Sequence, residues 1–242
     1  MNGTLYLIPV YLSEETDPIA VLAPHTISII HSLQHFIVEN EKSARAFLKA
    51  AKITIPQNQL SVLVYNKKEQ EPLADYFKDL SAGISVGILT EAGCPGIADP
   101  GAELIAEAHR KGIKVVPLVG PSSILLAMMA SGFNGQQFTF NGYLPIDKMA
   151  RSKKIQDLER LAERNNHTQL FMETPFRNNQ LLEEVLKSCK PDTYLSIATD
   201  ITDANEMIKR IGQKNSDINH YMIYRKTSNT NIPRNFFQKI IK

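Results

Sequence analysis

Segments with a strand pattern and segments with a helix pattern alternate along all 242 residues, and this alternation constrains the fold more than any other feature. Short runs rich in apolar and β-branched residues indicate strands, whereas apolar residues spaced three and four apart indicate helices. The expected strands are 4–10, 60–65, 84–89, 114–117, 137–143, 169–173, 193–198 and 220–225. The expected helices are 23–38, 42–51, 72–80, 101–110, 122–131, 150–164, 178–188 and 203–211. Such alternation predicts an α/β fold with mostly parallel sheets and helices on both faces.

The length allows one large domain or two smaller ones. The segment Val119–Gly120–Pro121 is the most economical hinge, so we predict an N-terminal α/β domain over residues 1–117 and a C-terminal α/β domain over 118–242. The formal net charge of +2 conceals an acidic first half and a basic second half. From Met207 to Lys242 the only acidic residue is Asp217, so this end either contacts phosphate groups or is a solubilising tail.

The composition, with 43% apolar and 21% charged residues, argues against disorder, collagen and coiled coil. The longest apolar stretch, Val115–Phe133, is interrupted by prolines and glycine, so we predict no membrane span. The first residues lack the basic and small-residue pattern of a signal peptide. Cys94 and Cys189 are too few for a disulfide framework. We therefore expect reduced thiols and a cytoplasmic location.

Several common motifs are missing. There is no dinucleotide-binding G-x-G-x-x-G, and the spacing Gly96–Gly101 lacks the lysine that a phosphate-binding P-loop needs. The six histidines form no metal-ligand pattern, so we predict no metal site.

The loop Thr90–Gly101 is the most informative segment. It follows an expected parallel strand and opens a helix, which is the edge of an α/β sheet where ligands bind. Its glycines and prolines favour a fixed shape with an accessible backbone, and Asp99 fits the N-cap of the next helix. The alternative is a rigid connection, but this loop is longer than a connection requires. A second loop, 116–123, leads into another helix, which Ser122 or Ser123 would cap.

These segments resemble a known family. The stretch Glu91–Gly101 is similar to the D-A-G-x-P-x-I-S-D-P-G signature of the ribosomal RNA small-subunit methyltransferase I family, which belongs to the tetrapyrrole methylase superfamily and methylates cytidine 2′-hydroxyls. Four further segments agree in order and spacing. They are Gly3–Pro9 (G-T-L-Y-L-I-P), Pro117–Ser123, Phe140–Arg151 (F-N-G-Y-L-P-x-x-K-x-x-R) and Phe171–Arg177 (F-M-E-T-P-F-R).

The resemblance implies two α/β domains of the tetrapyrrole methylase type, S-adenosylmethionine in a cleft between them, and a homodimer. It places the cofactor mainly against backbone groups of the corresponding loops. The implied cofactor-binding residues are Leu12, Cys94, Pro95, Ile97, Ser122, Ser123, Met172 and Ala198. A zwitterionic amino acid, a sulfonium and an adenine need mixed donors, acceptors and apolar walls, which stiff loops offer.

The sequence departs from the family pattern at several places. Glu91 stands where the family has Asp, Ala98 replaces Ser, and the late R-E-L-T-K motif is here Thr199–Asp203, without the Arg. The loops on the cofactor side agree better than the outer ones. The resemblance therefore points to the cofactor more strongly than to one substrate.

Three functional hypotheses follow. The first is methylation of RNA or a ribosomal subunit, the second is methylation of a tetrapyrrole or another small molecule, and the third is a cofactor-binding relative without catalysis. A ribose hydroxyl is a poor nucleophile and gains from a nearby base, for which Glu91 and Glu39 are candidates, although each also fits a surface or capping role. Positive side chains that would hold the substrate's phosphates are Lys148, Arg151 and Arg177, with Lys153 and Lys154 beside them. The alternative for residues 148–154 is the solvated face that their helix needs.

Overall fold

The computed structural model describes residues 1–65, 73–174, 176–212 and 220–225, the last segment through its backbone. The chain divides into two compact units, Met1–Ser122 and Ser123–Lys242. The domain boundary expected between residues 117 and 118 stays a prediction. Each unit contains one five-stranded sheet, so the α/β prediction is confirmed.

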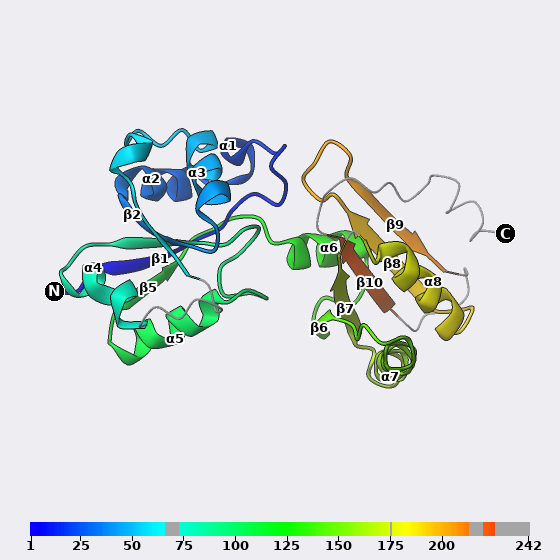
Figure 1. The fold of residues 1–242 in the computed structure, drawn as a ribbon. Coiled ribbons are helices and arrows are strands. Elements are labelled where there is room, and N and C mark those ends of the chain that lie inside the picture. The colour runs from blue at the N-terminus through cyan, green and yellow to red at the C-terminus, as the bar shows by residue number, and fades with distance from the viewer. Residues whose placement is uncertain (66–72, 175, 213–219, 226–242) are drawn as a thin grey trace. The chain divides into compact units, whose positions relative to one another are not determined.

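In the first unit the strand order is β3-β2-β4-β1-β5, and all neighbours are parallel. Figure 1 shows α1, α2 and α3 on one side of this sheet and α4 and α5 on the other. The strands are β1 (Thr4–Ile8), β2 (His35–Val38), β3 (Ser61–Val64), β4 (Val86–Leu89) and β5 (Lys114–Pro117). The helices are α1 (Pro18–Val21), α2 (Pro24–Ser32), α3 (Glu41–Ala50), α4 (Lys78–Ser81) and α5 (Gly101–Arg110), with 3-10 turns η1 (Gln57–Gln59) and η2 (Leu73–Phe77).

The central position of β4 follows from its composition. All of its residues are buried, as a strand covered on both faces requires. Only glycine fits at position 87, because a Cβ there would lie 2.6 Å from Ile8 Cδ1. On one face α2 and α3 contribute Ile30 and Phe47 to the core, and on the other α5 contributes Leu104.

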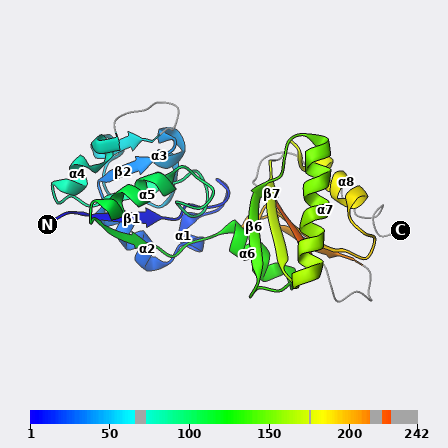
Figure 2. The same ribbon diagram turned by 90° about the horizontal axis from the view of Figure 1, so that it is seen from below.

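In the second unit the strand order is β6-β7-β10-β8-β9. Figure 2 shows α6 on the side of this sheet opposite α7 and α8. The strands are β6 (Phe138–Tyr143), β7 (Thr168–Glu173), β8 (Tyr194–Thr199), β9 (Met207–Ile211) and β10 (His220–Arg225), and the helices are α6 (Ser123–Ser131), α7 (Lys148–Asn165) and α8 (Asn178–Ser188). Helix α7 begins where the Asp147 carboxylate accepts from Ala150 N–H, and it ends at Asn166 in the left-handed conformation.

The expected helix 23–38 is wrong over its second half. Helix α2 ends at Ser32, and His35–Val38 form strand β2. The apolar spacing across both elements resembled one helix face. However, Phe36, Ile37 and Val38 are buried and paired in register with β3 and β4, so tertiary pairing overrides the local pattern.

The expected short helix 203–211 is also wrong. Residues Met207–Ile211 form β9, which pairs antiparallel with β8. The Arg210 guanidinium lies 4.5 Å from the Tyr194 ring and 4.8 Å from the Phe133 ring, and these contacts hold the edge strand. The expected helix 72–80 begins as a 3-10 turn at Leu73 before α4, and residue 72 lies outside the described residues. Much of the basic C-terminal end, 213–219 and 226–242, also lies outside them.

Candidate functional site

In the first unit, hydrogen bonds and packing join the loops that follow β1, β4 and β5. Val10 and Gly93 exchange backbone hydrogen bonds of 2.8 and 3.2 Å. The Cys94 thiol donates to the Pro121 carbonyl at 3.5 Å. A Cβ on Gly93 would lie 3.5 Å from Leu12 Cδ2. The carboxyl ends of these strands therefore share one loop cluster, at the edge where α/β sheets bind ligands.

The loop after β4 is closed on itself by Asp99. Both carboxylate oxygens accept from Gly96 N–H at 2.9 Å, and Oδ1 also accepts from Gly101 N–H at 2.7 Å. Gly93, Gly96 and Ala98 have φ values of 77°, 82° and 60°. These left-handed residues make the sharp turns of the loop, while the backbone groups of Gly93 and the N–H of Gly96 are taken up by Val10 and Asp99.

Asp99 is not the N-cap of α5, as expected from the sequence, but the residue before it. The N-cap of α5 is Pro100, which makes no side-chain cap bond. Asp99 instead binds the N–H of Gly101, the first helical residue, while it also holds the preceding turn. The carboxylate thus fixes the loop and the helix start together.

The expected cofactor-binding residues of the first unit lie in this cluster. Leu12 is buried, Cys94 and Ser122 are half-buried, and Ile97 is 54% exposed. Burial is the largest influence on the Cys94 thiol and raises its pKa. The hydrogen bond with Ser122 lowers this pKa, and the charge of Asp99 raises it. Cys94 therefore stays a neutral thiol at neutral pH and is suited to packing rather than nucleophilic chemistry.

The two candidate bases lie at the same sheet edge. One oxygen of Glu39, directly after β2, accepts from Thr90 Oγ1 at 2.6 Å and from Glu91 N–H at 3.4 Å. Glu91 is exposed, and its carboxylate accepts from Ser43 Oγ at 3.4 Å. The structure thus brings both carboxylates to adjoining positions, with Glu39 the more firmly held.

A small open pocket lies beside Glu39. Its empty volume is about 220 Å³, which includes the part open to solvent. Its polar lining comes from Glu39, Tyr65, Thr90 and Asp99. The Tyr65 hydroxyl donates to Glu103 Oε2 at 2.9 Å. Thr90 begins the loop that the sequence singled out, whereas Tyr65 does not stand out in the sequence, because no local motif surrounds it.

The pKa of Tyr65 gives a direct test of this arrangement. Burial, the hydrogen bond to Glu103 and the charge of Glu103 raise that pKa to about 12. Since an unfolded tyrosine titrates near pH 10, we expect the stability that this contact contributes to be complete below about pH 10 and lost as the pH rises through about 12. In an ultraviolet titration, Glu103→Gln should lower the Tyr65 pKa, whereas Glu107→Gln on the same helix should leave it unchanged. Equal titration curves for E103Q and wild type would contradict the assignment.

The remaining cofactor candidates belong to the second unit. Ser123 begins α6, and Met172 is half-buried within β7. Ala198 lies inside β8, fully buried and paired with β9 and β10. The strand is shifted by one residue from the expected 193–198, because it begins at Tyr194 and Thr199 also pairs.

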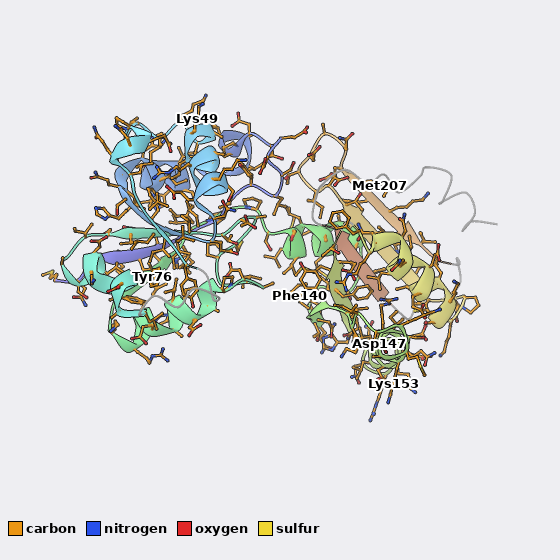
Figure 3. The ribbon with its side chains drawn as sticks, in the orientation of Figure 1. Lys49, Tyr76, Phe140, Asp147, Lys153 and Met207 are labelled. Atoms are coloured by element: carbon orange, nitrogen blue, oxygen red, sulfur yellow. The ribbon has the colours of Figure 1, made fainter. Side chains whose placement is uncertain are left out.

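The expected substrate-binding cations differ in exposure. Lys148 is exposed at the first turn of α7. Arg151 is only 7% exposed, and its Nη1 donates to the Ile146 carbonyl at 3.1 Å. Arg151 therefore supports the turn before α7, and its expected contact with a substrate phosphate stays a prediction. Figure 3 labels Asp147 and Lys153 on this segment.

Arg177 makes a buried ion pair that the sequence did not reveal. Its Nη2 lies 2.6 Å from Oε1 of Glu173, whose side chain is fully buried, and the same oxygen accepts from Thr174 N–H at 2.7 Å. Burial mainly raises the pKa of the nearby Tyr143; Glu173 adds to this effect and Arg177 opposes it. The spacing of four residues between Glu173 and Arg177 is a sequence signal for an ion pair on a helix. Here, however, Glu173 ends strand β7 and Arg177 precedes helix α8.

Within the described parts of both units, no cluster of three or more His, Cys, Asp or Glu side chains is arranged to hold a metal ion. The same residues include no helix long and apolar enough to cross a membrane.

Comparison with known proteins places the chain in a family. The model of the tetrapyrrole (corrin/porphyrin) methylases matches residues 21–212. The crystal structure of the methyltransferase CobJ shares this fold, with a TM-score of 0.54 over 88% of each chain at 15% identity. The chain belongs to the tetrapyrrole methylases and is a methyltransferase.

Sequence relatives narrow the position within that family. Ribosomal RNA small subunit methyltransferase I of Thermotoga maritima is 30% identical over 205 residues, which cover 84% of this chain and 88% of the relative. The protein of the same name from Vibrio cholerae is 26% identical over 210 residues, or 86% of this chain and 69% of the relative. Within the tetrapyrrole methylases, the chain therefore belongs to the ribosomal RNA small-subunit methyltransferase I branch.

Proposed function

We propose that this methyltransferase transfers the methyl group of S-adenosylmethionine to a ribose 2′-hydroxyl of small-subunit ribosomal RNA. The observation that carries the proposal is the similarity to relatives with that name over 84% and 86% of the chain. The likeness to CobJ supports the fold alone, because only 15% of the residues are identical.

The joined loops of the first unit fit the cofactor. Cys94, Pro95 and Ile97 contribute backbone and apolar groups from the loop after β4, Leu12 contributes from the loop after β1, and Ser122 from the loop after β5. We propose that Ser123, Met172 and Ala198 of the second unit also bind the cofactor. The cofactor supplies an activated methyl electrophile when bound, so the chain's task is to align the acceptor and place charge.

Glu39 is the proposed general base. A ribose hydroxyl must lose its proton as the methyl group is transferred, and a carboxylate within hydrogen-bond reach accepts that proton. The bonds from Thr90 and Glu91 fix one oxygen of Glu39, so the orientation of the carboxylate is set before substrate binds. Glu91 is the second candidate, and its exposure makes it the weaker one.

We assign the substrate phosphates to Lys148, with Lys153 and Lys154 beside it, and Arg151 to support of the adjoining turn. The family resemblance also leads us to propose a homodimer. Cys94 and Cys189 form no disulfide bond within the described residues, which suits the proposed cytoplasmic location.

Methyl transfer to small ribosomal subunits from a strain lacking this gene tests the function. We expect wild type to bind S-adenosylmethionine in a calorimetric titration and to transfer tritiated methyl to the RNA. Glu39→Gln should reduce the transfer rate by roughly 10²–10⁴-fold with little change in cofactor affinity, because it removes a base and leaves the loops intact.

The matched control is Glu41→Gln, since Glu41 is an exposed carboxylate that pairs with Arg45 on α3. Its transfer rate should equal that of wild type. No cofactor binding at millimolar concentration would refute the proposal. Transfer only to tetrapyrroles or other small molecules would favour the second hypothesis, and binding without any transfer the third.

A further inference from the structure

The carboxyl ends of β6 and β7 carry an unusual group of exposed apolar side chains. Phe176 is 88% exposed and Tyr143 is 50% exposed, and Ile146 and Met149 are 77% and 83% exposed. Exposed apolar residues are common singly, but several large ones at one edge mark a binding surface. We call Tyr143, Ile146, Met149 and Phe176 the aromatic edge.

The topology brings these residues together. Strands β6 and β7 are parallel neighbours, and Tyr143, the last residue of β6, pairs with Met172 near the end of β7. The chain passes from Tyr143 through Ile146 into the first turn of α7, and from the end of β7 through Phe176 to the start of α8. Both connections therefore leave the sheet at its carboxyl edge, where α/β sheets receive ligands.

The Glu173–Arg177 ion pair braces the segment that carries Phe176. It joins the end of β7 to the residue that precedes α8, on either side of Phe176. Arg177 N–H also donates to the Thr174 carbonyl at 3.1 Å. Oε2 of Glu173 and Nη1 of Arg177 are buried and have no hydrogen-bond partner among the described residues. Leaving buried charged atoms without a partner is costly, so the surrounding packing must hold this pair in place.

The charge around the aromatic edge is positive. From Asp147 to Asp157 there are four basic residues, Lys148, Arg151, Lys153 and Lys154, against the two acids at the ends, a net charge of +2. Lys148 and Lys153 are exposed. A surface that combines exposed rings with exposed lysines suits a nucleic acid strand, whose bases stack on the rings while its phosphates meet the cations. A second protein surface would gain from the apolar residues alone and would have to desolvate the lysines.

We propose that the aromatic edge binds an unstacked base of the RNA substrate, with Phe176 as the stacking residue and the Glu173–Arg177 pair as its support. The inference rests on the proposed function and adds the part of the second unit that holds the RNA. Tyr143 provides a second ring, and Lys148 and Lys153 hold the flanking phosphates.

The test measures binding of the full chain to small-subunit RNA over a range of salt concentrations. Phe176→Ala should weaken binding by roughly five- to hundredfold, the effect of losing one stacked base. It should leave the slope of the logarithm of affinity against the logarithm of salt unchanged, because no charge is removed. Lys153→Ala should instead lower that slope by about 1. Phe176→Trp keeps an aromatic ring at this position and should bind RNA as tightly as wild type.

The matched control is Leu161→Ala, an apolar residue of α7 that is 46% exposed and lies about two turns beyond Lys154. Its affinity for RNA should equal that of wild type. Equal affinities for F176A and wild type, or equal losses for F176A and L161A, would overturn the inference. So would conversion of a dimer to a monomer by F176A in sedimentation experiments, since the edge would then be a subunit interface. Failure of the proposed function looks different, because wild type itself would then transfer no methyl group to RNA.

Discussion

Glu173→Gln is expected to lower the free energy of unfolding by about 3 kcal/mol, the cost of removing one partner from a buried ion pair. Glutamine keeps the shape of the side chain, and its amide oxygen can still accept from Thr174 N–H. It removes the negative charge that faces Arg177, which is only 24% exposed. The guanidinium then has neither full hydration nor a counter-charge, and this uncompensated charge causes the loss.

Denaturant unfolding followed by circular dichroism measures this effect. The matched control is Glu183→Gln, which breaks an exposed pair with Lys187 on α8, separated by 3.8 Å. Exposed pairs of this kind contribute about 0.5 kcal/mol or less. The double variant E173L/R177M should recover most of the stability, because it removes both charges together. If E173Q costs no more than E183Q, the pair is not the support that the structure indicates.

Gly120→Ala is expected to separate the loops of the first unit and to weaken cofactor binding by roughly tenfold or more, since small displacements of a bound ligand have large effects. A Cβ at Gly120 would lie 2.4 Å from Pro9 Cβ and 2.9 Å from Leu22 Cδ2. Real carbon atoms do not approach so closely, so Pro9 or Gly120 has to move. The loops after β1 and β5 contact one another here, and the proposed cofactor residues Leu12 and Ser122 lie on them.

Calorimetric titration with S-adenosylmethionine measures the affinity, and thermal unfolding measures an accompanying stability loss of about 1–3 kcal/mol, typical of overpacking. Gly135→Ala is the control, because nothing lies within 4 Å of the added carbon. Unchanged cofactor affinity in G120A would show that the contact between Pro9 and Gly120 does not shape the site.

The strand and helix patterns of the sequence predicted most of the fold. Strand β5 and helix α8 have the expected bounds, because short apolar runs and amphipathic spacing reflect burial on one or both faces. The errors at His35–Val38 and Met207–Ile211 have one cause. In each segment the apolar spacing is compatible with either period, and the neighbouring strand decides which is adopted.

The loops of the candidate site could also be identified from the amino-acid sequence, since glycine, proline and a strand end mark them. Their mutual contacts could not. The pairing of Val10 with Gly93 joins residues distant in the chain, and so does the bond from Thr90 to Glu39. Local spacing contains no information on such partners.

Local chemistry alone thus predicted the α/β class, the order of most elements and the loops of the candidate site, because patterning and turn residues act over a few neighbouring positions. The folded chain decided the rest. It made Arg151 a buried support, enclosed Glu173 beside Arg177 and left Phe176 exposed. Burial and partners depend on what the sheet brings alongside a side chain, and that is a property of the tertiary structure.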